Sequence, residues 1–181
     1  MLFWRPLFLI IMKHTDITTT KELANYLRCD ADFLESAINF EYYLHNKEID
    51  FSESDSKIVV SKFNIPKKGK NGGYRTVYKC HSYFLANTLK ILNTNLNQIF
   101  TPNKFSHGFV KGRNIQTNAS CHLSKKIILS VDFKNYFESI TKDQVIEALV
   151  KLGFKNKVAE WISCITTINN VLVQGFATSP T

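Results

Sequence analysis

The chain has 181 residues, of which 44% are hydrophobic, so it can bury one real core and at most a small lobe beside it. Its four cysteines show no CxxC pair and no regular spacing, which argues against a disulfide framework or a zinc knuckle and favours the reduced cytoplasm. The net charge is +8, and the stretch between Asp55 and Asp132 holds 13 of the 23 basic residues and none of the 15 acids. This pooling favours a polyanionic partner such as nucleic acid, the alternative being an ordinary basic surface.

The N-terminal end carries an apolar run over residues 1–11. The run is far shorter than the roughly 20 residues that span a bilayer, and no small-residue cleavage site follows it. We therefore expect neither a signal peptide nor a membrane partner. Translation can start at Met1 or at Met12.

Helical and β-rich spacing then alternate along the chain. A threonine among residues 18–20 can cap a helix through the apolar positions that follow. Residues 58–65 and 74–78 are β-rich and flank a glycine-rich basic turn, which predicts a β-hairpin. Helical spacing returns over 82–100, and Pro102 forbids its uninterrupted continuation.

The last third of the chain mixes strand and helix, and the expected fold class is α+β. Residues 127–131 form a short apolar run that fits a buried strand, and this strand would end at Asp132. Thr141 and Gln144 form a capping-box signature for the next helix. A second helix, over 156–168, precedes an asparagine turn and a short strand.

Asp132 opens the stretch DFKNYFESI. By itself, an aspartate after a strand is more often a helix cap or a salt-bridge partner than a metal ligand. The stretch, however, resembles the first catalytic aspartate motif of reverse transcriptases. The resemblance implies that Asp132 and Phe133 bind magnesium, with two ions activating the primer 3′-hydroxyl and stabilising the leaving pyrophosphate. It also implies that Phe133 and Phe137 contact the nucleotide, with Phe137 lying under the sugar to reject a 2′-hydroxyl; core filling is the alternative for Phe137.

The predicted hairpin carries a second motif. Its KFNIPKK segment, followed by GGYR, is similar to the fingers hairpin of the same family, in which a lysine and an arginine grip the triphosphate of the incoming nucleotide. The resemblance assigns these roles to Arg75 and to Lys67 or Lys68. A planar guanidinium suits phosphate because it can hold two oxygens at once, whereas a lysine acts as a mobile point charge. The alternative is a solvated hairpin tip.

Three further blocks follow in the family's order. SHGF with KGRNI resembles a loop that lies along the template, and NASCH matches the NAxxH hallmark of retron enzymes. These two blocks imply template contacts from Lys111, Arg113, Asn114, Asn118 and His122. QGFATSP resembles the QGxPTSP block and implies that Gln174 and Gly175 line the nucleotide and template pocket. Val173 and Ala177 stand where the family usually has proline, which leaves loop stiffness and pocket shape open.

The resemblance covers residues 57–181 and identifies the chain as a member of the retron-type reverse transcriptases. It implies an N-terminal helical layer with an apolar tail over 1–56, fingers with the basic hairpin and the template loop over 57–126, and the start of the palm over 127–181. The implied function is RNA-directed DNA polymerase, which copies part of a structured non-coding RNA into DNA with Mg²⁺. The implied partners are that RNA as template and primer, deoxynucleoside triphosphates, the RNA–DNA duplex and an effector protein in phage defence.

The family's YxDD motif is expected after the QG block, and it does not occur before Thr181. One carboxylate cannot hold two magnesium ions, because their charge needs several oxygen ligands from the protein. We therefore expect the palm to stop before the second catalytic aspartates and the 181 residues to be inactive alone. The alternative is a non-catalytic RNA-binding fragment or one half of a split enzyme.

Overall fold

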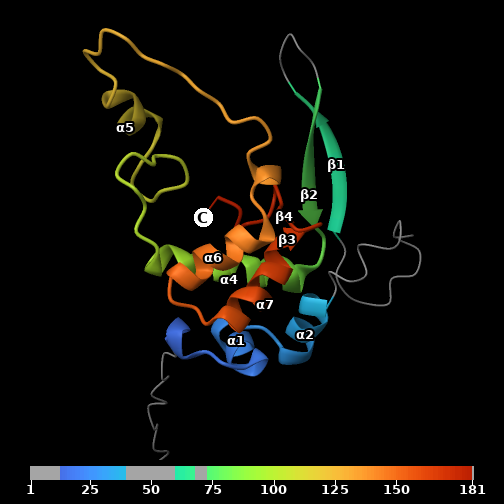
Figure 1. Ribbon diagram of the computed structural model, residues 1–181. Helices are drawn as coiled ribbons and strands as arrows, with labels where there is room; N and C mark the ends of the chain where they lie inside the picture. The colour runs from blue at the N-terminus through green and yellow to red at the C-terminus, as the bar shows by residue number, and fades with distance from the viewer. Residues whose placement is uncertain (1–12, 40–59, 68–72, 181) are drawn as a thin grey trace, which may run out of the picture.

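The computed structural model describes residues 13–39, 60–67 and 73–180. Helices and two small antiparallel sheets make up this part of the chain, which confirms the α+β class at that coarse level (Figure 1). The N-terminal apolar run and Lys68 lie outside the described residues. Among those described, no helix is long and apolar enough to cross a membrane.

The N-terminal layer consists of a 3-10 turn, η1 (His14–Asp16), and two helices, α1 (Thr20–Leu27) and α2 (Ala31–Asn39). The Thr19 hydroxyl accepts the Glu22 N–H, and the Glu22 carboxylate accepts the Thr19 N–H, so the predicted threonine cap is confirmed. Hydrogen bonds to the Thr18 hydroxyl and N–H, and to Thr19, lower the pKa of Glu22 to about 2. The helical spacing continues into α2, but the backbone breaks where Arg28 adopts φ 52°, so two helices form.

The predicted hairpin is confirmed: β1 (Val60–Pro66) pairs with β2 (Tyr74–Cys80) in antiparallel register from Val60 opposite Cys80 to Pro66 opposite Tyr74. The hairpin projects from the helical body (Figure 1). Its outer half is exposed, and only its base packs on the core through Val60, Tyr78 and Cys80. The part of the hairpin that carries Lys67 and Arg75 is therefore held out from the body.

The helix α4 (Tyr83–Ile99) is the central element of the body and confirms the prediction for this segment. The Ser82 hydroxyl caps its first turn by accepting the Leu85 N–H. Its inward positions follow helical spacing and are buried: Leu85, Thr88, Leu89, Leu92 and Leu96. Residues 101–131 then leave the body as an arm that carries the short helix α5 (Ile115–Ser120) (Figure 1).

Two helices follow the arm. A turn, η3 (Phe137–Ser139), leads to α6 (Lys142–Lys151), which starts with the predicted capping box of Thr141 and Gln144. The helix α7 (Asn156–Thr166) ends two residues before the predicted end, because residues 167–168 pair as a strand instead.

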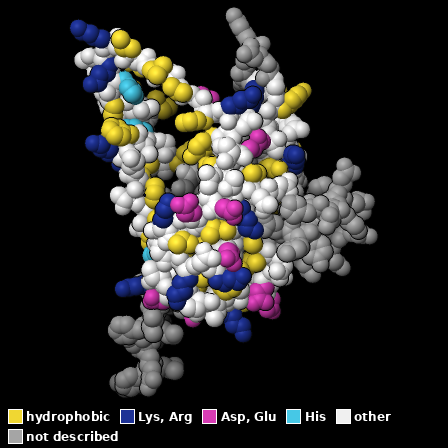
Figure 2. Space-filling model, in the orientation of Figure 1, with side chains coloured by type: hydrophobic (Ala, Val, Ile, Leu, Met, Phe, Trp, Pro, Cys, Tyr) yellow, Lys and Arg dark blue, Asp and Glu magenta, His cyan; other side chains and the backbone are white. Residues whose placement is uncertain are grey.

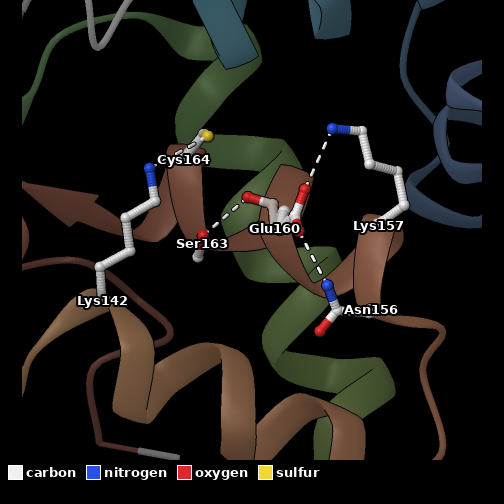
Figure 3. Close-up of polar contacts among 6 residues, drawn as sticks. All are labelled: Lys142, Asn156, Lys157, Glu160, Ser163 and Cys164. Atoms are coloured by element: carbon white, nitrogen blue, oxygen red, sulfur yellow. Dashed lines mark hydrogen bonds and ion pairs between the residues drawn. The ribbon is translucent and has the colours of Figure 1, made fainter.

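The last small sheet joins β3 (Thr167–Ile168) to β4 (Val171–Leu172). Asn169 and Asn170 form its turn with φ of 54° and 60°, which confirms the predicted asparagine turn. On α7, the Glu160 carboxylate accepts hydrogen bonds from Asn156 and Lys157, as Figure 3 shows.

The core is one cluster that joins the N-terminal layer, α4 and α7. Its fully buried members include Leu23 and Leu27 of α1, Leu92 of α4, and Val158 and Ile162 of α7. Since these helices lie far apart in sequence, the cluster fixes the body on which the hairpin and the arm are mounted.

The predicted buried strand over 127–131 is wrong. This segment has no strand pairing, and its apolar side chains are exposed, with Ile127 at 88% and Leu129 at 85%. A strand is stabilised by hydrogen bonds to a neighbouring strand, and no described strand lies beside this segment. The apolar run alone therefore did not determine its structure.

The core assignment predicts different results for the same substitution on two helices. Val158→Ala in α7 should lower the free energy of unfolding by about 2 kcal/mol, because it removes two methyl groups from a fully buried side chain. Val150→Ala in α6 is the matched control; its side chain is 41% exposed, and the expected change is within about 0.5 kcal/mol. Urea denaturation measures both, and equal losses would contradict the assignment.

Candidate functional site

A cavity of about 590 Å³ opens between the hairpin and the segment that begins at Asp132. Three stretches of chain form it, and all three carry motifs that the sequence singled out. The lining residues are Lys67, Tyr74, Arg75, Thr76, Asp132, Phe133, Lys134, Asn135, Tyr136, Phe137, Glu138 and Gln174. Six of the predicted catalytic and nucleotide-binding residues therefore meet in one place.

The hairpin supplies the basic wall of the cavity. The Lys67 N–H donates to the Gly73 carbonyl at 2.8 Å and continues the β ladder past the end of β1. Arg75 stands opposite Ile65 in the register and is exposed. Because the two strands are fully paired, the backbone positions of Lys67 and Arg75 are fixed relative to each other, while the charged ends of both side chains reach water.

The segment that begins at Asp132 supplies the acidic and aromatic wall of the cavity, and it also carries one cation, Lys134. Asp132 and Glu138 both line the cavity, and neither forms an ion pair within the described residues. Between them the chain turns sharply, with φ of 53° at Asn135. The Phe133 and Tyr136 rings lie 6.2 Å apart and line the same cavity as the two carboxylates.

Phe137 is held by the small sheet that follows α7. The Leu172 N–H donates to the Ile140 carbonyl at 2.9 Å, and the Lys142 N–H donates to the Asn170 carbonyl at 2.9 Å. The ring of Phe137 lies 5.6 Å from that of Tyr136 at 77° and is half-buried. The ring is therefore anchored on its backbone side and presented to the cavity on the other.

The third stretch ties the hairpin to the body through backbone contact. The Tyr78 N–H donates to the Gln174 carbonyl at 2.9 Å. Gly175 follows with φ 118°, and a β-carbon at this position would overlap the Tyr78 carbonyl oxygen. Gln174 lines the cavity, whereas Gly175 lies behind it against β2. Burial, with a smaller contribution from the charge of Glu138, raises the pKa of Tyr78.

The donor atoms that line this cavity are of the chemical type that a hard cation binds. Carboxylate oxygens come from Asp132 and Glu138, and Phe133 can offer only its backbone carbonyl, because its ring has no donor atom. Within the part of the chain that is described, no three acidic, histidine or cysteine side chains gather closely enough to hold a metal ion. The donor set is therefore oxygen-rich but small.

The residues predicted to bind template lie on the arm, away from this cavity. Arg113 donates to the carbonyls of Asn103 and Ser106 and so closes the loop on which it sits. Asn114 caps α5 by accepting the Thr117 N–H at 2.9 Å. Lys111 borders a separate cavity beside α4, and the side chains of Asn118 and His122 are exposed.

Several lining residues were not singled out from the sequence. Glu138 lies inside the DFKNYFESI stretch, so its position next to Phe137 was a signal for it. Tyr74 lies inside the GGYR segment, and its position next to Arg75 was a signal for it. Thr76 follows Arg75 on β2, and no sequence pattern distinguishes it from an ordinary strand residue.

The sequence model of a family described as reverse transcriptase (RNA-dependent DNA polymerase) matches residues 65–181, which include all three stretches of the cavity. The chain belongs to the reverse transcriptase family. It is 29% identical to the Retron Ec86 reverse transcriptase of Escherichia coli over 118 residues, which are 65% of this chain and 37% of that protein.

Two reverse transcriptases of Myxococcus xanthus also match. Retron Mx65 is 37% identical over 62 residues, 34% of this chain and 14% of that protein. Retron Mx162 is 30% identical over 115 residues, 64% of this chain and 23% of that protein. Together the matches support the retron type that the motifs predicted, and the chain spans little more than a third, or less, of each of these relatives.

The Gly175 contact predicts a local effect in this reverse transcriptase chain. Gly175→Ala should separate β2 from the QG block, because the added methyl group meets the Tyr78 carbonyl and the residue needs positive φ. The expected result is faster hydrogen exchange at the Tyr78 amide and a lower melting temperature. Gly108→Ala is the control, since a β-carbon there has nothing within 4 Å; equal exchange in both variants would contradict the contact.

Proposed function

We propose that the cavity between the hairpin and the Asp132 segment is the nucleotide site of a retron-type RNA-directed DNA polymerase. The observation that carries this proposal is that Lys67 and Arg75 share one cavity with Asp132, Phe137 and Gln174. A nucleoside triphosphate needs cations for its phosphates, a flat surface for its sugar and carboxylates for its metal ions. This cavity offers all three from separate stretches of chain.

Arg75 would hold two phosphate oxygens through its planar guanidinium, and Lys67 would add a mobile positive charge. Phe137 would lie under the sugar, where a ring leaves no room for a ribose 2′-hydroxyl, and Gln174 would contact the nucleotide. Asp132, with the backbone carbonyl of Phe133, would hold magnesium. When bound, that ion supplies charge neutralisation for the phosphates and a lowered pKa for the attacking hydroxyl.

The template would be a structured RNA held by the arm through Lys111, Asn118 and His122. Arg113 and Asn114 would support RNA binding indirectly, because the side chains of both form hydrogen bonds within the arm. Following the family resemblance, we extend the proposal to fingers over 57–126, a palm starting at 127, an effector partner and a role in phage defence. The cytoplasm stays our prediction for the location, on the cysteine pattern of the sequence.

A second function is supported by the small number of metal donors at the cavity. In the described residues, no group of three acidic, histidine or cysteine side chains can hold a metal ion. A protein that holds RNA without copying it would need the basic hairpin and the arm but no metal ligands. Primer extension with the complete product of the gene distinguishes the two functions.

Asp132→Asn should stop DNA synthesis by that product while leaving its melting temperature and RNA affinity unchanged. An amide keeps the shape but offers magnesium one neutral oxygen in place of a carboxylate. The loss should exceed the roughly 10- to 100-fold that removing a supporting group costs a metal site. If Asp132 were only a helix cap, asparagine would serve as well.

Asp143→Asn is the matched control, because Asp143 is exposed in the first turn of α6 and does not line the cavity. It should extend primers at the wild-type rate. Synthesis by Asp132→Asn within a few-fold of that rate would refute the metal assignment.

A further inference from the structure

Two segments of the arm bring a cysteine next to a histidine. The Sγ atom of Cys121, at the end of α5, lies 3.7 Å from the Nε2 atom of His107, which belongs to the loop before that helix. The Cys121 side chain is exposed, and the His107 ring is half-buried. This separation is within hydrogen-bonding reach of a sulfur atom, so the thiol can pass its proton to the ring. Neither residue lines the cavity that contains Asp132.

The tautomer of His107 follows from a second contact of its ring. The Nδ1 atom lies 3.0 Å from the Thr117 hydroxyl. That hydroxyl donates its hydrogen to the Asn114 carbonyl at 2.8 Å and accepts the Asn114 N–H at 2.9 Å. Because a hydroxyl has only one hydrogen, Thr117 can only accept a hydrogen bond from His107. The neutral ring therefore carries its hydrogen on Nδ1, and Nε2 presents its lone pair to Cys121.

The three side chains have the arrangement of an activated thiol. Nucleophilic chemistry needs a nucleophile, a base within reach of its proton and a third group that orients the base. Cys121, His107 and Thr117 occupy these three positions. The Cys121 thiol also lies 3.4 Å from the Thr117 carbonyl, a second acceptor that keeps the sulfur beside the ring.

The surroundings of this pair suit a reactive thiol. Reactive cysteines are typically partly exposed and lie among positive charges. The sequence between Asp55 and Asp132 has no acidic residue, and Figure 2 shows Lys, Arg and His side chains together on the arm. The other three cysteines, Cys29, Cys80 and Cys164, are half-buried, and burial raises the pKa of the Cys29 and Cys80 thiols.

We propose that Cys121 is a site at which peroxides oxidise this chain, with His107 as the base. The Nε2 atom takes the thiol proton, and the sulfur attacks one oxygen of the peroxide. The S–O bond forms as the O–O bond breaks, and the sulfur gives up two electrons to become a sulfenic acid. The leaving hydroxide takes the proton back from His107 and departs as water. This chemistry requires neither the polymerase activity nor an RNA partner.

The sharpest test compares the folded protein with the unfolded one. Hydrogen peroxide is added to the complete product of the gene at neutral pH, dimedone traps the sulfenic acid, and peptide mass spectrometry measures the rate at each cysteine. Burial slows the reaction of a thiol, so a faster reaction in the folded state requires an activating neighbour. Cys121 should react roughly tenfold faster or more in the folded protein than in urea, whereas Cys29 and Cys80 should react more slowly.

His107→Asn then identifies the activating neighbour. The asparagine amide can still donate to the Thr117 hydroxyl, but it cannot take a proton from the thiol. The rate at Cys121 should fall roughly tenfold or more, while the melting temperature stays at the wild-type value. His81→Asn is the matched control, because it removes an exposed imidazole that contacts the Ser61 hydroxyl at 2.8 Å on the hairpin. It should leave the rate at Cys121 unchanged.

A rate at Cys121 that is no higher in the folded protein than in urea would overturn the inference. A wild-type rate in His107→Asn would overturn it as well. The first comparison needs no variant, so it decides the question even where His107→Asn does not fold. Neither result depends on whether Asp132→Asn abolishes primer extension, so failure of the thiol site and failure of the polymerase proposal can be told apart.

Discussion

The candidate nucleotide site depends on one backbone contact, between Tyr78 of β2 and the pair Gln174–Gly175. The hairpin has little buried surface of its own, and without an anchor its orientation toward the Asp132 segment would not be fixed. The hydrogen bond from the Tyr78 N–H to the Gln174 carbonyl provides that anchor, and the missing side chain of Gly175 allows the two backbones to approach. Gly175, which does not line the cavity, thus helps to hold its basic wall opposite its acidic wall.

The opposite charges on the two sides of this cavity determine which kind of ligand it can bind. Lys67 and Arg75 of the hairpin line one cavity with the segment that carries Asp132, Lys134 and Glu138, yet these side chains form no ion pair with one another. Side chains so placed can each serve a different part of a ligand that carries phosphates and metal ions. The match to the reverse transcriptase family covers the same residues, and under the proposal the triphosphate would lie between the two walls.

The sequence predicted elements whose signals are local. The capping boxes at Thr19 and Thr141 satisfy backbone groups within one turn, so their residues are sufficient to mark helix starts. The strand prediction for residues 127–131 was wrong for the opposite reason. A strand depends on hydrogen bonds to a neighbouring strand, and apolar spacing does not show whether such a neighbour is present. Half of the residues that line the cavity were predicted from motifs. The structural role of Gly175 was not predicted, because a close approach to a strand about 100 residues earlier leaves no local pattern.

Under the proposed function, the cavity between the hairpin and the Asp132 segment holds a nucleoside triphosphate. The most direct test is a titration of the chain with a fluorescent deoxynucleoside triphosphate and magnesium, comparing Arg75→Gln with Lys79→Gln. Both variants remove one charge from β2, but Arg75 lines this cavity and Lys79 lines another. We predict that Arg75→Gln weakens binding roughly tenfold or more, as expected for lost hydrogen bonds to a charged group, while Lys79→Gln binds as the wild type does. Equal affinity in the two variants would contradict the assignment of this cavity to the triphosphate.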